Sequence, residues 1–189
     1  MYLVKVFFFL GILVFLGMPS ATTLAQMDLI ALAERSHRVV RARPVASRVE
    51  WRDSHLWTIY TFSVDEDLLH SGAQTIEVEQ PGGRLDGYTT VVSGVKNYQS
   101  DASEILFLWQ GEKSMQVLGY SLGSLSLVQS SDGEWLVSSL NGPSEVTSEN
   151  NLQFSMMRLR GSTKKFQKLN QFKRSRSVSD LKSFLEEIR

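Results

Sequence analysis

Between Val39 and Val137 the sequence consists of short stretches in which apolar and polar residues alternate, separated by turn-forming residues. Alternation with a period of two sends successive side chains to opposite faces of a β-strand. The clearest pair is a hairpin of 39–51 and 55–65, both rich in β-branched and aromatic residues. Shorter strands are predicted at 75–80, 88–92, 105–109, 115–120, 124–129 and 135–137. This pattern indicates a mainly β fold, a small antiparallel barrel or sandwich.

Two of these strands carry more specific expectations. Pro44 has no amide hydrogen, so it is predicted at an edge or a bulge of the first strand. The segment 105–109 (ILFLW) is apolar at every position. Because both faces of this strand are apolar, we expect both of them to be covered.

A helix is predicted on either side of the strand region. Residues 28–35 form a short helix that Asp28 can cap. Residues 178–189 repeat apolar side chains with the i, i+3, i+4, i+7 spacing of an amphipathic helix, and Ser177 with Asp180 resembles the start of a capping box. A helix of this length is marginal by itself, so we expect it to dock on the strand domain.

The first residues predict export. An apolar run covers 6–18, Lys5 is the only charge before it, and small residues lead up to Ala25. This order is typical of a cleaved signal peptide at 1–25, since a membrane-spanning helix needs about 20 apolar residues. The alternative is an uncleaved anchor that extends to Leu24. With cleavage, the mature chain is exported to the periplasm or the exterior and does not span the membrane. The sequence has no cysteine, which excludes disulfides, a lipid-modified cysteine and cysteine-ligated zinc.

The composition changes after the last predicted strand. Residues 141–152 are polar and turn-rich, and no acidic residue occurs between Asn151 and Ser179. We therefore divide the chain into a signal peptide (1–25), a β-barrel domain (26–140), a polar and then basic linker (141–176) and a C-terminal helix (177–189). The linker carries a candidate anion-binding patch, which comprises Arg158, Arg160, Lys164, Lys165, Lys168, Lys173, Arg174 and Arg176.

Cations without counter-charges attract phosphate or sulfate groups in a salt-dependent way. In an exported protein we expect an anionic lipid or envelope polymer as the target, and no nucleic acid. The simpler interpretation, which the sequence favours, is a solvated linker, because charge runs usually serve solubility.

Few residues suggest catalysis. His37, His55 and His70 form no HExxH pair, so a helical zinc site is not predicted. Residues 119–123 (GYSLG) match the letters G-x-S-x-G around Ser121, but a nucleophile elbow requires a strand, a turn and a helix, and the next segment alternates like a strand. We therefore favour a turn at this point and expect neither enzyme activity nor a cofactor or metal. A secreted serine hydrolase that uses Ser121 is the alternative.

Several segments resemble a group of uncharacterised exported bacterial proteins that pair an N-terminal helix with a small β-barrel of the OB or tissue-inhibitor/netrin-module type. They are 36–40, 57–64, 78–83, 91–94, 104–108 and 119–120. The resemblance covers about 28–137 and implies an OB-like barrel. The sequence departs from the group at Arg41 and Ala42, where a glycine is usual, and at Ser103, where a Gly-Glu pair is common. Metalloprotease inhibition is not implied, because the inhibitors bind zinc through an N-terminal cysteine.

These observations together predict an exported, non-enzymatic β-barrel module that acts as a binding or structural protein of the cell envelope or exterior. Its expected partner is an envelope protein or an anionic surface. Two alternatives stay open: the hydrolase built on Ser121, and an electrostatic binder of anionic envelope surfaces through residues 158–176.

Overall fold

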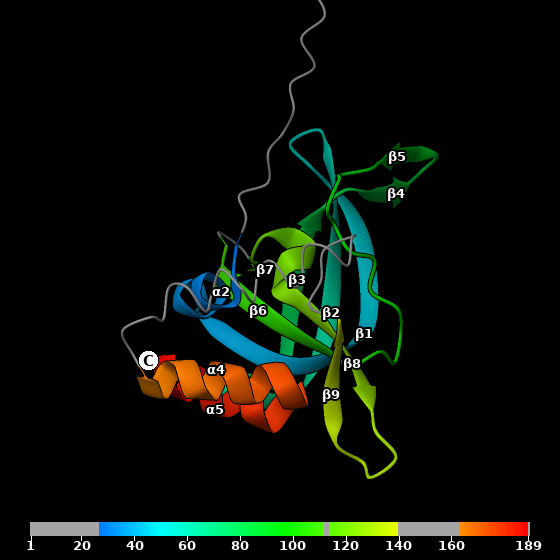
Figure 1. The fold of residues 1–189 in the computed structure, drawn as a ribbon. Coiled ribbons are helices and arrows are strands. Elements are labelled where there is room, and N and C mark those ends of the chain that lie inside the picture. Colours follow the sequence, from blue (N-terminus) through cyan, green and yellow to red (C-terminus); the bar gives the residue numbers. More distant parts are fainter. Residues whose placement is uncertain (1–26, 112–113, 140–162, 189) are drawn as a thin grey trace, which may run out of the picture.

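The computed structural model describes residues 27–111, 114–139 and 163–188 (Figure 1). The predicted signal peptide, Arg158 and Arg160 lie outside these residues. The elements in chain order are α2 (Leu29–Arg35), β1 (Arg38–Arg52), β2 (His55–Leu69), β3 (Thr75–Pro81), β4 (Gly83–Leu85), β5 (Tyr88–Thr90), β6 (Glu104–Gln110), β7 (Met115–Val117), the 3-10 helix η1 (Tyr120–Gly123), β8 (Ser124–Gln129), β9 (Trp135–Ser139), α4 (Thr163–Ser175) and α5 (Val178–Ile188).

Seven strands form one sheet in the order β1-β2-β3-β7-β6-β8-β9, and β1 also pairs with β6. The strands β1, β2, β3, β7 and β6 therefore close into a ring. All pairings are antiparallel except that of β3 with β7, which meet in parallel at Val78 and Met115. The mainly β prediction is confirmed, but the sheet is mixed, which the alternation of single strands did not indicate. The short strands β4 and β5 form a separate hairpin.

The first hairpin is longer than predicted, because β1 and β2 have 15 residues each. Its turn has positive φ at both central residues, 48° at Asp53 and 66° at Ser54, as in the type I′ turns that match strand twist. The register shifts between Pro44 and Ala46. Pro44 thus lies at a bulge, as its missing amide hydrogen predicts.

Two apolar clusters share β6. Leu106 and Leu108 belong to the cluster inside the ring, with Tyr60, Phe62 and Val78 among the other members. The opposite side of β6 contributes Ile105 and Phe107 to a second cluster, which the helices cover. All four β6 side chains are fully buried. The prediction that both faces of this strand are covered is therefore confirmed.

The C-terminal part contains two helices where the sequence predicted one. Helix α4 lies within the range expected to be a linker, and its Leu169 and Phe172 are fully buried. It ends at Ser175. The next residue, Arg176, has a left-handed φ of 55°, and its amide donates to the Phe172 carbonyl at 2.7 Å. Helix α5 begins as predicted, since the Asp180 amide donates to the Ser177 hydroxyl at 3.2 Å. The two helices lie side by side below the sheet (Figure 1).

Helix α2 also follows its prediction. Asp28 accepts a hydrogen bond from the Ala31 amide at 2.7 Å, which caps the helix. Its Leu29, Ile30 and Leu32 pack into the cluster beneath the helices. Among the described residues, no helix combines the length and apolar character that a membrane crossing requires.

Candidate functional site

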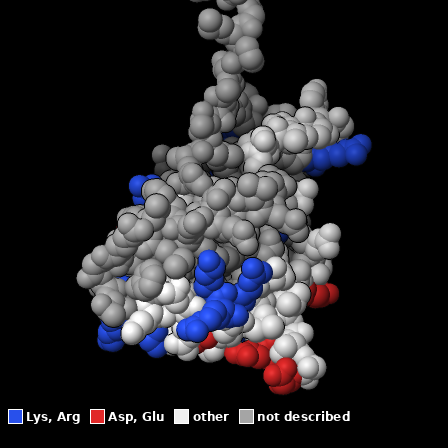
Figure 2. Space-filling model, viewed as in Figure 1, with Lys and Arg blue, Asp and Glu red and all other residues white. Residues whose placement is uncertain are grey.

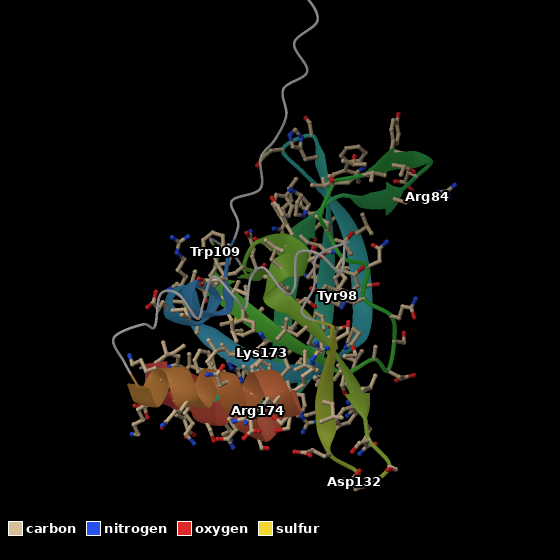
Figure 3. The ribbon with its side chains drawn as sticks, viewed as in Figure 1. Arg84, Tyr98, Trp109, Asp132, Lys173 and Arg174 are labelled. Carbon is tan, nitrogen blue, oxygen red and sulfur yellow. The ribbon has the colours of Figure 1, made fainter. Side chains whose placement is uncertain are left out.

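The predicted anion-binding residues that the structure describes lie on α4 or directly after it. Leu169 and Phe172 fix the helix to the cluster below, and this leaves the cationic side chains at its surface. Lys173, Arg174 and Arg176 are exposed, and Lys168 is half-buried. Figure 2 shows Lys and Arg side chains gathered at the C-terminal end of α4, and Figure 3 labels Lys173 and Arg174 there.

The cations of α4 differ in their partners. Lys164 forms an ion pair with Glu187 at 2.8 Å, and the Lys165 amine donates to the Ile188 carbonyl at 3.3 Å. Lys168, Lys173, Arg174 and Arg176 form no ion pair with any acid of the described residues. We call these four side chains the α4 basic cluster.

The strands use their cations differently. The basic side chains of β1 and of the loop before β6 are matched with nearby carboxylates, as in Arg38–Asp67, Arg41–Asp65, Arg43–Asp65, Arg48–Glu77, Arg52–Glu79 and Lys96–Glu104. The ring therefore carries a locally neutral charge pattern, and most of the described cations without an ion pair lie on α4 or directly after it.

Two of these pairs change the acidity of their carboxyl groups. The hydrogen bond from Arg48 lowers the pKa of Glu77. Glu79 is largely buried, which opposes its ionisation, but hydrogen bonds from the Gln116 amide and the Arg52 guanidinium outweigh burial and lower its pKa. Both carboxylates are thus held ionised, and each is paired with an arginine.

The most enclosed polar network was not predicted from the sequence. The Lys96 amine lies 2.7 Å from each oxygen of the Glu104 carboxylate and donates to the Ser126 hydroxyl at 2.7 Å. The Ser124 hydroxyl donates to Glu104 at 3.0 Å. Lys96 lies in a loop, Glu104 in β6 and the serines in β8, and no local sequence pattern predicts that they meet. Only the pairing of the strands brings this network together. A lysine that acts as a general base must be neutral, whereas Lys96 here serves as the counter-ion of Glu104.

Tyr98 closes the ring interior beside this network. Its ring packs edge-on against Tyr60 and Phe62, with centroids 5.1 Å apart in both cases. Burial raises the pKa of the Tyr98 phenol, so the group is neutral in the folded chain. The described side chains inside the ring pack into one buried apolar cluster.

The candidate nucleophile lies in a turn. Ser121 belongs to η1, after Gly119 and Tyr120, which both have positive φ. Its amide donates to the Gly94 carbonyl at 2.9 Å. Within the described residues, its hydroxyl makes no hydrogen bond with a histidine or a carboxylate. A short 3-10 turn leading into a strand is the geometry that the alternation after Ser121 predicted.

The histidines lie apart from Ser121. His37 and His70 line an open cavity of about 370 Å³ between the start of β1 and the β2–β3 loop, together with the buried Arg38. The backbone amide of Gln110 donates to His37 Nδ1 at 3.1 Å. His55 is exposed at the β1–β2 turn. In the described part of the chain, no group of three or more histidine, aspartate or glutamate side chains is arranged to hold a metal ion.

The chain matches no protein-family model, no curated protein and no solved structure. The likeness to exported bacterial proteins with an OB-like barrel therefore stays a prediction.

Proposed function

We propose that the chain is an exported, non-enzymatic binding module that attaches to an anionic surface of the cell envelope through the α4 basic cluster. The observation that carries this function is the separation of charge: the arginines of β1 are matched by carboxylates, whereas the four cations of the cluster form no ion pair with an acid of the described residues.

The strand ring supports a small OB-type barrel as the scaffold. Taken in chain order, the ring strands are β1, β2, β3, β6 and β7. The first pairs with both the second and the fourth, and the third lies parallel to the fifth. This closure is typical of the five-stranded Greek-key barrel of OB proteins. A filled interior favours binding at the outer surface.

The expected strength follows from simple electrostatics. A lysine or arginine near an anionic membrane contributes about 1 kcal/mol, which falls off within a Debye length. Four unmatched cations therefore provide on the order of 4 kcal/mol, enough for reversible and salt-sensitive attachment. Lys173 and Arg174 also lie in the last turn of α4, where they stabilise the helix dipole.

Vesicle sedimentation tests this function. The protein is mixed with vesicles of phosphatidylglycerol and phosphatidylcholine, or of phosphatidylcholine alone, across a salt series. We expect binding to the anionic vesicles only, and less of it as salt rises. An arm with soluble polyphosphate separates a lipid requirement from affinity for phosphate groups in general.

The decisive variant changes Lys168, Lys173, Arg174 and Arg176 to glutamine. Its matched control changes Arg35, Arg43, Arg48 and Lys182 to glutamine, which removes the same charge elsewhere. We expect the first variant to lose vesicle binding and the control to keep most of it. Equal losses would attribute binding to net charge and would overturn the assignment to α4.

Export and the absence of catalysis need their own tests. N-terminal sequencing of the exported protein should find a start after Ala25; a retained N-terminus would favour the uncleaved anchor. A serine-reactive phosphonate probe should leave the protein unlabelled. Labelling that Ser121→Ala abolishes would instead establish the hydrolase.

A further inference from the structure

The β4–β5 hairpin lies at the end of the molecule opposite α4 (Figure 1), and its Tyr88 forms an exposed aromatic pair with Trp51 of β1. Trp51, near the end of β1, is 45% exposed, and Tyr88, at the start of β5, is 64% exposed. Their rings meet edge to face, with centroids 5.5 Å apart and planes at 76°. This pair of rings, which we call the Trp51–Tyr88 platform, thus joins two hairpins and is partly exposed to solvent.

The two hairpins are held firmly together. The Gly82 amide donates to the Leu56 carbonyl at 2.8 Å, and the Thr58 hydroxyl donates to the Gly82 carbonyl at 2.8 Å. A Cβ at Gly83 would lie 2.7 Å from the Thr58 hydroxyl and 2.8 Å from a Val49 methyl group, so only glycine permits this approach. The two hairpins that carry the rings are therefore ordered before a ligand binds, which lowers the entropic cost of binding.

Packing within the chain covers these rings only in part. Trp57 and Trp135 each lie beneath an arginine, at 5.9 Å from Arg52 and 5.4 Å from Arg41. In the described residues no cation lies over Trp51 or Tyr88. Large aromatic side chains that are rigid and exposed mark interaction sites.

The size of the platform limits its partner. Because an aromatic side chain carries about 150–250 Å² in all, the exposed parts of the two rings amount to roughly 200 Å². A standard protein interface needs about 800 Å² from each partner. The platform matches one or two rings of a small ligand or chain.

The polar groups beside the rings specify the chemistry. Asp53 and Asp86 occupy the two turns, and Arg84 is exposed on β4 (Figure 3). Both aspartates lie in the turns of the hairpins that carry the rings, and carboxylates are costly in lipid and repelled by anionic headgroups. Carboxylates accept hydrogen bonds from hydroxyl groups, and a guanidinium donates hydrogen bonds to hydroxyl oxygens. We propose that the Trp51–Tyr88 platform binds a neutral saccharide chain, stacking the apolar faces of its sugar rings.

Calorimetric titration of the full chain tests this site with two probes, the hexasaccharides of β-1,4-linked glucose and of β-1,4-linked N-acetylglucosamine. We expect at least one to bind, and Trp51→Ala and Tyr88→Ala to weaken binding about tenfold or more. Trp109→Ala is the matched control, since Trp109 is 37% exposed on β6, away from the platform. All three variants should stay folded, with only a small loss of melting temperature, because each removes a ring that is partly buried.

The result can be separated from that of the α4 cluster. The four-glutamine α4 variant should keep saccharide binding, and Trp51→Ala should keep binding to anionic vesicles. Failure of both hexasaccharides to bind, or an equal loss in Trp109→Ala, would overturn the saccharide site. Loss of vesicle binding in Trp51→Ala would assign the rings to a membrane instead.

Discussion

At the scale of single residues, the ion pairs of this protein differ mainly in how far water reaches them. The Glu104 side chain is 5% exposed and that of its partner Lys96 is 21% exposed. The pair between Lys182 and Glu66 is 39% and 34% exposed. Removing one partner of a buried pair strands a charge, whereas an exposed pair contributes little.

We therefore expect Lys96→Met to lower the free energy of unfolding by about 3 kcal/mol, because the Glu104 carboxylate would lose its counter-ion. Lys182→Met, the exposed control, should cost less than about 1 kcal/mol. Urea unfolding of both variants measures the difference. Similar losses would contradict a buried, structural role for Lys96.

Glu79 makes stability depend on pH. Its pKa in the folded chain is lowered, so ionised Glu79 contributes stability that is fully present above the usual pKa of a glutamate and is lost as the pH falls toward the lowered value. Unfolding free energy should thus be flat above about pH 5 and should decline below it. Glu79→Gln should be less stable at neutral pH and decline less steeply. A variant that declines as steeply as the parent would exclude Glu79 as the cause.

At the scale of elements, glycines fix how the β4–β5 hairpin docks. Gly83 and Gly87 both have positive φ, but a Cβ at Gly87 would meet nothing within 4 Å. Gly87→Ala should cost only the strain of the backbone, about 1 kcal/mol, whereas Gly83→Ala adds contacts with Thr58 and Val49 and should cost distinctly more. Thermal melting compares them, and equal shifts would contradict the close packing of this hairpin.

Helix α4 shows a further dependence on packing. The Phe172 side chain, on the inner face of the helix, is fully buried, and the neighbouring Lys173 is exposed. Phe172→Ala should cost about 3–5 kcal/mol in unfolding free energy, while Lys173→Ala should change it by less than about 0.5 kcal/mol. If the Phe172 variant unfolds like the parent, α4 is not part of the folded core.

The elements also differ in how well the sequence predicts them. The β1–β2 hairpin follows from local alternation, the bulge from the missing amide hydrogen of Pro44, and the two covered faces of β6 from its continuous apolar run. Helix α4 could not be predicted in this way, because its few apolar residues lie among lysines. It is the packing of these apolar residues into the cluster beneath the helix that stabilises it. The parallel contact of β3 with β7 and the Lys96–Glu104 network depend on ring closure, which no local pattern encodes.

At the scale of the whole molecule, the two apolar clusters meet at β6, so the ring and its helices form one folded unit. This arrangement holds α4 and the β4–β5 hairpin, which carries Tyr88, at opposite ends (Figure 1). In the function that we propose, one end attaches to an anionic surface and the other binds a saccharide.

Lysine acetylation footprinting tests the central claim, attachment through α4, most directly. The protein is acetylated with and without phosphatidylglycerol vesicles, and each lysine is quantified by mass spectrometry. We predict that vesicles protect Lys168 and Lys173, while Lys182, which pairs with Glu66, keeps its reactivity. Vesicle-bound protein in which Lys168 and Lys173 react as fast as in free solution would contradict it.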